Sequence, residues 1–250
     1  MGIVFNQSYK NIIIIVFALI IGGVNTLYFY PVFLKEQYYG LVVFLLATSN
    51  LLQPIISFGS QHTIIKYFSS FNTKKEKDNF MSSIIFLPLF TIIPITFLVV
   101  EFHDMIADFI SVKNQIIENY VWVIFLVAFA TSYFEVFYSW SRVQLKSVFG
   151  NFLKEIYPRF SVLVLLILVY FDFISKENFI WWLTGLYYLR LLIMIFYSLS
   201  LYLPRFSFSL PKNTRSILTY SLYILLAGSA ASILIDIDKF MIPQKQAISQ

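Results

Sequence analysis

The chain contains no cysteine, which excludes disulfide bonds, thiol nucleophiles and cysteine-ligated metals. Charged residues are also scarce, at 12% of 250 residues, against about 25% in an ordinary soluble domain. There are only two histidines, His62 and His103, and the sequence has no HExxH, GxSxG or glycine-rich phosphate-binding motif. We therefore expect neither a soluble domain nor an enzyme, and no catalytic residue, metal or cofactor.

What the sequence has in abundance is apolar and aromatic side chains. Hydrophobic residues make up 59% of the chain and aromatic residues 20%, and the mean hydropathy is +0.77. A bilayer core of about 30 Å needs roughly 20 apolar residues in a helix, because lipid offers the backbone no hydrogen-bond partners. Seven runs qualify: residues 12–30, 39–58, 80–100, 120–140, 157–173, 179–202 and 217–242. The sequence thus predicts an all-α polytopic membrane protein with about seven transmembrane helices.

Positive charges gather in alternate segments between these runs. Cytoplasmic loops are enriched in Lys and Arg, so this alternation indicates orientation. The basic segments hold 12 of the 18 Lys and Arg residues, namely Lys10, Lys66, Lys74, Lys75, Lys77, Arg142, Lys146, Lys154, Arg159, Arg205, Lys212 and Arg215. We expect a multi-pass protein of the inner cell membrane with a cytoplasmic amino terminus. The net charge of +5 then reflects topology, and no nucleic-acid partner is expected.

Ionisable residues within the predicted spans are the candidate functional residues, because each costs about 2.5 to 3.5 kcal/mol at a helix centre. They are Glu135, Arg190, Asp236, Asp238 and Lys239. Arg190 lies mid-span, too deep to reach either surface, and should face an interior cavity. Asp236 and Lys239 are three residues apart on one helical face and are expected to neutralise each other. For Glu135, a structural carboxylate and a functional one both stay open.

Four stretches of the chain resemble the polysaccharide-biosynthesis flippases. These proteins move lipid-linked oligosaccharides, such as O-antigen precursors, and belong to the multidrug, oligosaccharidyl-lipid and polysaccharide exporter superfamily. The stretches are KEQYYG at 35–40, FGSQHTIIKYF at 58–68, RVQLK at 142–146 and DIDKFMI at 236–242. The resemblance covers nearly the whole chain.

The resemblance implies a fold of two six-helix lobes around a central cavity that opens alternately to each side. Residues 1–203 would form the first lobe and 204–216 a cytoplasmic linker between lobes. Residues 217–250 would hold the first helix of a second lobe, the rest of which is missing, so the chain is expected to be a truncation or a fragment. The implied partners are the bilayer, a lipid-pyrophosphate-linked glycan and the missing second lobe.

The resemblance also implies that cations in the cavity hold the pyrophosphate of the substrate. Arg190 is the best candidate, followed by Lys66, Arg142 and Arg159, since Arg and Lys are good phosphate donors. Glu135, Asp236 and Asp238 are candidates for binding a coupling ion. Two alternatives stay open: a multidrug exporter that carries cations on such carboxylates, and a membrane glycan polymerase or ligase. The second would need a larger outer loop than residues 101–119 supply.

Overall fold

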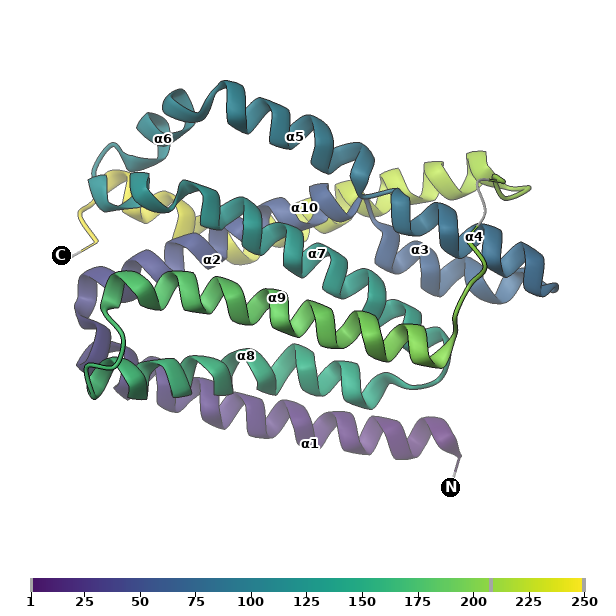
Figure 1. The fold of residues 1–250 in the computed structure, drawn as a ribbon, viewed down its shortest axis with the longest axis horizontal. Helices are drawn as coiled ribbons and strands as arrows, with labels where there is room; N and C mark the ends of the chain where they lie inside the picture. Colours follow the sequence, from purple (N-terminus) through teal and green to yellow (C-terminus); the bar gives the residue numbers. More distant parts are fainter. Residues whose placement is uncertain (1, 207–208, 249–250) are drawn as a thin grey trace.

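The computed structural model of this protein describes residues 2–206 and 209–248, and within them every regular element is a helix. Figure 1 shows the long helices lying side by side in one bundle. The helices are α1 (Ile3–Val24), η1 (Asn25–Leu34), α2 (Lys35–Ser57), α3 (Ser60–Tyr67), η2 (Phe68–Ser70), α4 (Lys74–Phe86), α5 (Leu89–Glu101), α6 (His103–Ser111), η3 (Gln115–Tyr120), α7 (Val121–Val143), α8 (Ser147–Tyr170), α9 (Lys176–Leu201) and α10 (Thr214–Lys245).

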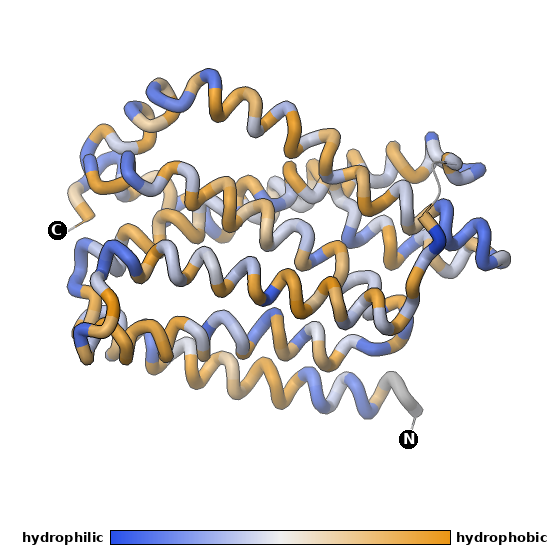
Figure 2. Tube along the Cα trace, viewed as in Figure 1, coloured by the Kyte–Doolittle hydropathy of each residue, from blue (hydrophilic) through white to orange (hydrophobic). Residues whose placement is uncertain are grey.

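Five helical segments are long and apolar enough to cross a membrane: Phe5–Ser57, Lys74–Glu101, Gln115–Val143, Lys176–Leu201 and Thr214–Lys245. Apolar residues run along the middles of the helices, whereas many hydrophilic ones lie toward the ends (Figure 2). Many large apolar side chains face outward, including Leu27, Phe90 and Leu234 at 83%, 74% and 84% exposure. Because so much apolar surface cannot face water, these helices indicate a membrane protein.

The first of these segments contains a reversal of the chain. Figure 1 shows α1 and α2 running in opposite directions, with η1 at the turn between them. The turn is a π-helix that contains Pro31, whose missing amide hydrogen removes one helical bond. The predicted separation of the spans at residues 12–30 and 39–58 is therefore visible as a bend between helices.

Helix α8 differs from the span predicted at residues 157–173, because it begins ten residues earlier, at Ser147. Gly150 and Pro158, two residue types that often interrupt helices, both lie inside it. A proline removes only one backbone hydrogen bond, and neighbouring helices can support the kinked backbone. Because Lys154, Glu155 and Arg159 lie in its first part, α8 is not among the five segments that qualify by composition.

Gly59 joins α2 to α3 in a conformation that favours glycine. Its φ is +67°, in the left-handed region, and a Cβ atom there would lie 2.6 Å from the backbone oxygen of Ser221 in α10. Next to this contact, the hydroxyls of Thr63 and Ser221 lie 2.8 Å apart in a hydrogen bond. The glycine therefore allows both the turn between α2 and α3 and the close approach of α10.

The helices are held together by two apolar clusters and by small hydroxyl residues between them. One cluster includes Leu41, Ile124 and Leu166, and the other includes Phe80 and Trp140. Three serine hydroxyls donate to carbonyls of neighbouring helices: Ser49 to Ile124 (2.9 Å), Ser132 to Gln53 (3.1 Å) and Ser198 to Phe137 (2.7 Å). Such small polar residues allow close packing in membranes, where lipid tails give helices no hydrophobic drive to associate.

Residues 202–206 and 209–213, between α9 and α10, form no regular helix and overlap the predicted linker at 204–216, whose last three residues already belong to α10; residues 207–208 lie outside the described residues. Tyr202, the first residue after α9, donates a hydrogen bond of 2.6 Å to the buried carboxylate of Asp78 in α4. Burial and this bond raise the pKa of the Tyr202 phenol. Helix α10 then runs back along the bundle and packs most extensively against α2.

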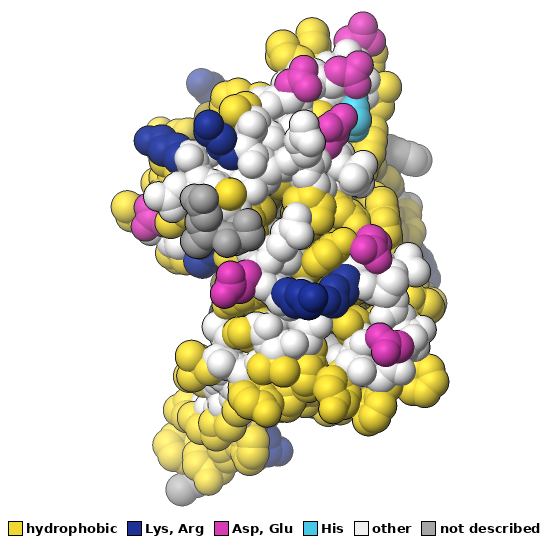
Figure 3. Space-filling view, turned by 90° about the vertical axis from the view of Figure 1, so that its left-hand side faces the viewer, with side chains coloured by type: hydrophobic (Ala, Val, Ile, Leu, Met, Phe, Trp, Pro, Cys, Tyr) yellow, Lys and Arg dark blue, Asp and Glu magenta, His cyan; other side chains and the backbone are white. Residues whose placement is uncertain are grey.

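The end of the bundle at which α6 lies, away from α4, carries the acidic loops. Figure 3 looks onto this end and shows Asp and Glu side chains set among hydrophobic ones. Helix α6, with Asp104 and Asp108, lies here, and Glu177 begins α9 and accepts a 2.6 Å hydrogen bond from Tyr38. The acidic and basic loops thus lie at opposite ends of the bundle, as the charge pattern predicts.

Candidate functional site

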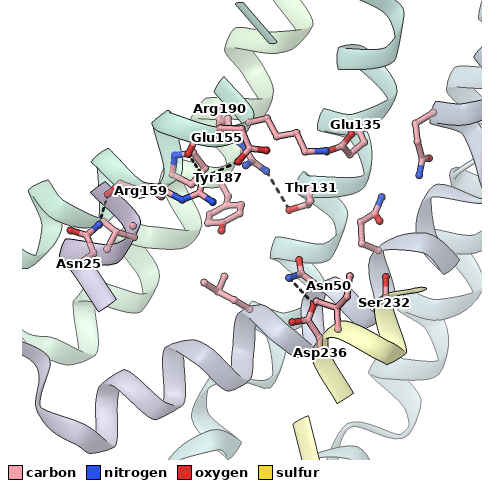
Figure 4. Close-up of a pocket in the computed structure, with 18 of the residues that line it drawn as sticks. Asn25, Asn50, Thr131, Glu135, Glu155, Arg159, Tyr187, Arg190, Ser232 and Asp236 are labelled. Carbon is pink, nitrogen blue, oxygen red and sulfur yellow. Dashed lines mark hydrogen bonds and ion pairs between the residues drawn. The ribbon is translucent and has the colours of Figure 1, made fainter. Parts of the chain in front are cut away.

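A cavity of about 770 Å³ lies within the bundle between α1, η1, α2, α3, α7, α8, α9 and α10. Figure 4 shows how side chains from these helices converge on it. The exposed residues Arg142, near the end of α7, and His62, in the first turn of α3, lie at its basic end. Apart from tyrosines, its polar lining consists of Asn25, Thr26, Asn50, Gln53, Gln61, His62, Thr131, Glu135, Ser139, Arg142, Lys154, Glu155, Arg159, Arg190, Ser232 and Asp236.

Arg190 is the most deeply placed cation in the lining. It lies 14 residues after the start of α9, about 21 Å along the helix, and is only 5% exposed. Its guanidinium carbon lies 4.3 Å from the ring centre of Phe134 and 4.7 Å from that of Tyr187. One long hydrogen bond of 3.4 Å joins its Nη2 to the hydroxyl of Thr131, and its buried Nε has no partner among the described residues. The rings fix the guanidinium while part of its donor capacity stays unused.

Most of the other charges around the cavity are paired. Lys154 lies 2.7 Å from Glu135, Arg159 lies 2.9 Å from Glu155, and Lys239 lies 2.5 Å from Asp236. The lining contains four cations and three carboxylates, so its net charge is +1. Within the described part of the chain, Arg142 and Arg190 are the two lining cations that form no ion pair. The cavity therefore has spare positive charge at its mouth and at its depth.

Arg159 is positioned by the close approach of α1 to α8. Its side chain lies against Gly22, where a Cβ atom would be only 2.9 Å from its Nε. The amide nitrogen of Asn25, which is buried, donates a 2.7 Å hydrogen bond to the backbone oxygen of Arg159. The guanidinium also bonds to the backbone oxygen and the carboxylate of Glu155 one turn earlier. The missing side chain at Gly22 thus makes room for a cation in the cavity wall.

The wall formed by α2 and α10 has a different chemistry. It presents amides and a hydroxyl, including Asn50, Gln53 and Ser232, and its carboxylate Asp236 is 6% exposed. Figure 4 shows Asn50, Ser232 and Asp236 lying across the cavity from Arg159 and Arg190. Asn50 donates a 3.3 Å hydrogen bond to Asp236, whose other oxygen contacts Lys239. One wall is therefore cationic and the other mainly neutral.

His62 lies at the basic end of the cavity, in α3. Although part of its side chain is exposed, partial burial of the imidazole lowers its pKa; the negative charge of Glu135 opposes this shift, and the positive charges of Arg142 and Lys154 add to it. The neutral imidazole is therefore favoured there, and His62 adds no charge to the cavity mouth at neutral pH.

The structure brings together most, but not all, of the residues predicted as candidates. Arg190, Arg142, Arg159, Glu135 and Asp236 all line the cavity. Lys66 does not, and its ammonium group lies 3.7 Å from the ring centre of Tyr220 in α10. Asp238 is exposed and faces away from the lining. The predicted pairing of Asp236 with Lys239 is confirmed, and the ion pair of Glu135 fits its structural interpretation.

Other lining residues were not singled out from the sequence. Lys154 was assigned only to topology, although it pairs with Glu135, and Glu155 was not considered, although its spacing from Arg159 suits an ion pair within one helix. Asn50 and Gln53 are three apart in a mostly apolar run, which places two amides on one helical face. That polar spacing is the signal that would have found them.

The described residues contain no group of three His, Asp or Glu side chains that could hold a metal ion. Comparison with models of protein families, with curated proteins and with solved structures found no match for the chain. The resemblance to the flippases therefore stays a prediction from the four sequence stretches, and the cavity has to be interpreted from its own geometry.

Proposed function

We propose that this chain is part of a membrane carrier that binds an anionic, lipid-linked head group in the central cavity and passes it across the membrane. Its best candidate substrate is a lipid-pyrophosphate-linked glycan, which makes the protein a flippase of the cell membrane. The observation that carries the proposal is Arg190, a buried guanidinium that lines the cavity and whose Nε has no hydrogen-bond partner in the described part of the chain. A charged group at such depth is costly, and an anionic ligand would compensate it.

The arrangement of the other cations supports the same ligand. Arg142 is exposed at the cavity mouth and forms no ion pair with the residues that the structure describes, so it can attract an anion from the basic end of the bundle. Arg159 and Lys154 lie between helices and can exchange their carboxylate partners for phosphate oxygens. Arg is well suited to phosphate because its planar fork donates two parallel hydrogen bonds.

The proposed topology has seven crossings and a cytoplasmic amino terminus. Counting α1 and α2 separately and adding α8 to the remaining candidates gives that number. In this arrangement the helices up to α9 form one lobe, and α10 begins a second lobe against α2. Rocking of the second lobe against the first would open the cavity alternately to each side.

A carrier of cations is less well supported by the same residues. Such a carrier needs carboxylates that are free to bind its substrate, whereas Glu135 and Asp236 each contact a lysine at 2.7 Å and 2.5 Å. Asp238, the third predicted carboxylate, does not line the cavity. The sign of the unpaired lining charges therefore favours an anion over a cation.

Binding of farnesyl diphosphate, a short anionic lipid, to the purified chain in nanodiscs tests the proposal. Arg190→Gln should weaken binding about 10- to 100-fold, because hydrogen bonds to charged groups contribute about 1.5 to 3 kcal/mol. The affinity of Arg190→Lys should lie between those of Arg190→Gln and the unchanged protein, because lysine keeps the positive charge but not the planar pair of donors.

Lys66→Gln is the matched control, because it removes a positive charge that lies outside the cavity. It should bind farnesyl diphosphate as the unchanged protein does. Thermal unfolding of each variant in the same nanodiscs shows whether the fold is kept. Equal affinity of the unchanged protein, Arg190→Gln and Lys66→Gln would contradict the proposal.

A further inference from the structure

Three amide side chains of α2 and α3 form a polar row along one wall of the cavity. Asn50 and Gln53 lie in α2, and Gln61 lies just past the Gly59 turn in α3. A second cavity of about 270 Å³ elsewhere in the bundle is lined almost entirely by apolar side chains, so polar lining is not a general property of this protein. The amide row is therefore a specific feature of the wall that α2, α3 and α10 form.

The two glutamines lack the partners that buried polar groups normally have. Gln53 Nε2 and Gln61 Oε1 are buried and form no hydrogen bond within the described residues. Among the hydroxyls on the same helices, Ser57 donates a 3.2 Å hydrogen bond to the backbone oxygen of Pro54 and Thr63 bonds Ser221, whereas Ser60 Oγ, beside Gln61, is also buried without a partner among the described residues. Most buried polar side chains in proteins have a partner, so unpartnered amides beside a cavity indicate a bound polar ligand or water.

There is room for a ligand beside these amides. A further cavity of about 360 Å³ lies between α2, α3 and α10 and shares Gln53, Gln61, His62 and Ser232 with the central one. Small residues of α10, Ala227 and Gly228, form its other side. The space next to the glutamines thus borders the central cavity, and its α10 side includes Ile224 as well as the small residues Ala227 and Gly228.

The chemistry of this wall suits a neutral, hydroxyl-bearing group. An amide has two donors and an acceptor with two lone pairs, and a sugar hydroxyl both donates and accepts, so each amide can bind adjacent hydroxyls. An anion would instead prefer the guanidinium groups of Arg159 and Arg190 on the opposite wall. A single ligand that carries both kinds of group would span the cavity.

We propose that Gln53 and Gln61 bind the sugar hydroxyls of the head group, while Arg190 holds its phosphate from the opposite wall. This inference rests on the proposed function, because it assigns the two walls to two parts of the same substrate. The two glutamines then determine recognition of the sugar but not of the anionic lipid.

The experiment compares two kinds of probe on the full chain in nanodiscs. One is farnesyl diphosphate, and the other is farnesyl diphosphate that carries a single glucose, galactose or N-acetylglucosamine. The ratio of their dissociation constants measures the contribution of the sugar. A net hydrogen bond contributes roughly 2- to 12-fold, so two amides should give a ratio of about ten for the best sugar.

Gln53→Leu with Gln61→Leu should bring that ratio close to one and leave farnesyl diphosphate binding unchanged. Gln53→Asn, which keeps an amide but shortens it, should also reduce the ratio and guards against misfolding of the leucine variant. Gln37→Leu is the matched control, because Gln37 is exposed in the first turns of α2 and lines neither cavity. It should keep the ratio of the unchanged protein.

The outcomes separate this inference from the proposed function. An unchanged ratio in the glutamine variants would overturn the inference and show that the amides bind only water. Equal binding of all sugar probes and farnesyl diphosphate by the unchanged protein would overturn it as well. Farnesyl diphosphate binding that is insensitive to Arg190→Gln would instead overturn the proposed function. Arg190→Gln is expected to weaken the binding of both kinds of probe by the same factor, so the ratio of their dissociation constants should not change.

Discussion

The two neighbouring glycines of α1 allow a sharp test of how Arg159 is positioned. At Gly22 an added Cβ atom would lie 2.9 Å from Arg159 Nε and 3.0 Å from its Cδ, whereas at Gly23 it would meet nothing within 4 Å. Both lie inside α1, one residue apart. Gly22→Ala and Gly23→Ala therefore make the same change in helix propensity, and only the first displaces the guanidinium.

The expected magnitudes follow from these contacts. Alanine stabilises a helix interior by about 0.5 to 1 kcal/mol relative to glycine, and Gly23→Ala should gain that amount. Gly22→Ala gains it too but disturbs the ion pair between Arg159 and Glu155, which are 33% and 24% exposed. Such a partly exposed pair contributes about 0 to 1 kcal/mol, so the net change in stability should be near zero.

The effect on ligand binding should be larger than the effect on stability. Losing one charge-assisted contact of about 1.5 kcal/mol weakens farnesyl diphosphate binding roughly tenfold in Gly22→Ala. Gly23→Ala should bind as the unchanged protein does. Both quantities can be measured in nanodiscs, by thermal unfolding and by titration with the probe. Equal affinities of the two variants would refute the role of Gly22 in placing Arg159.

Two further predictions concern the turn after α2 and the topology. Gly59→Ala should lower the free energy of unfolding by about 2 kcal/mol or more, because it adds left-handed strain and a contact of 2.6 Å with a backbone oxygen. Gly185→Ala is the control and should not lower it, because the added Cβ atom meets nothing within 4 Å. Equal thermal stability of the two variants would contradict this prediction. The chain has no native cysteine, so single cysteines can report the topology. A cysteine in place of Lys176 should react with a membrane-impermeant reagent added outside intact cells, whereas one in place of Lys75 should react only from the inside. Labelling of position 75 in intact cells would contradict the proposed topology.

The sequence by itself determined the class of fold and the depth of the key charge. Long apolar runs can only be helices in a bilayer, because lipid leaves the backbone no other partner, and this holds whatever the packing. The position of Arg190 in the middle of its run likewise required a polar surrounding. Asp236 and Lys239 were predictable as a pair because a helix places residues three apart on one face.

Only the tertiary structure decided which polar side chains share the cavity. Glu135 meets Lys154 across two helices, and Arg159 fits against a glycine of α1, more than 130 residues earlier in the chain. Lys66 and Asp238 had suitable chemistry but face elsewhere. The physical reason is that hydropathy indicates which long apolar segments can cross the bilayer, whereas the ends of a helix, as at α8, and its rotation about its own axis depend on the residues it packs against.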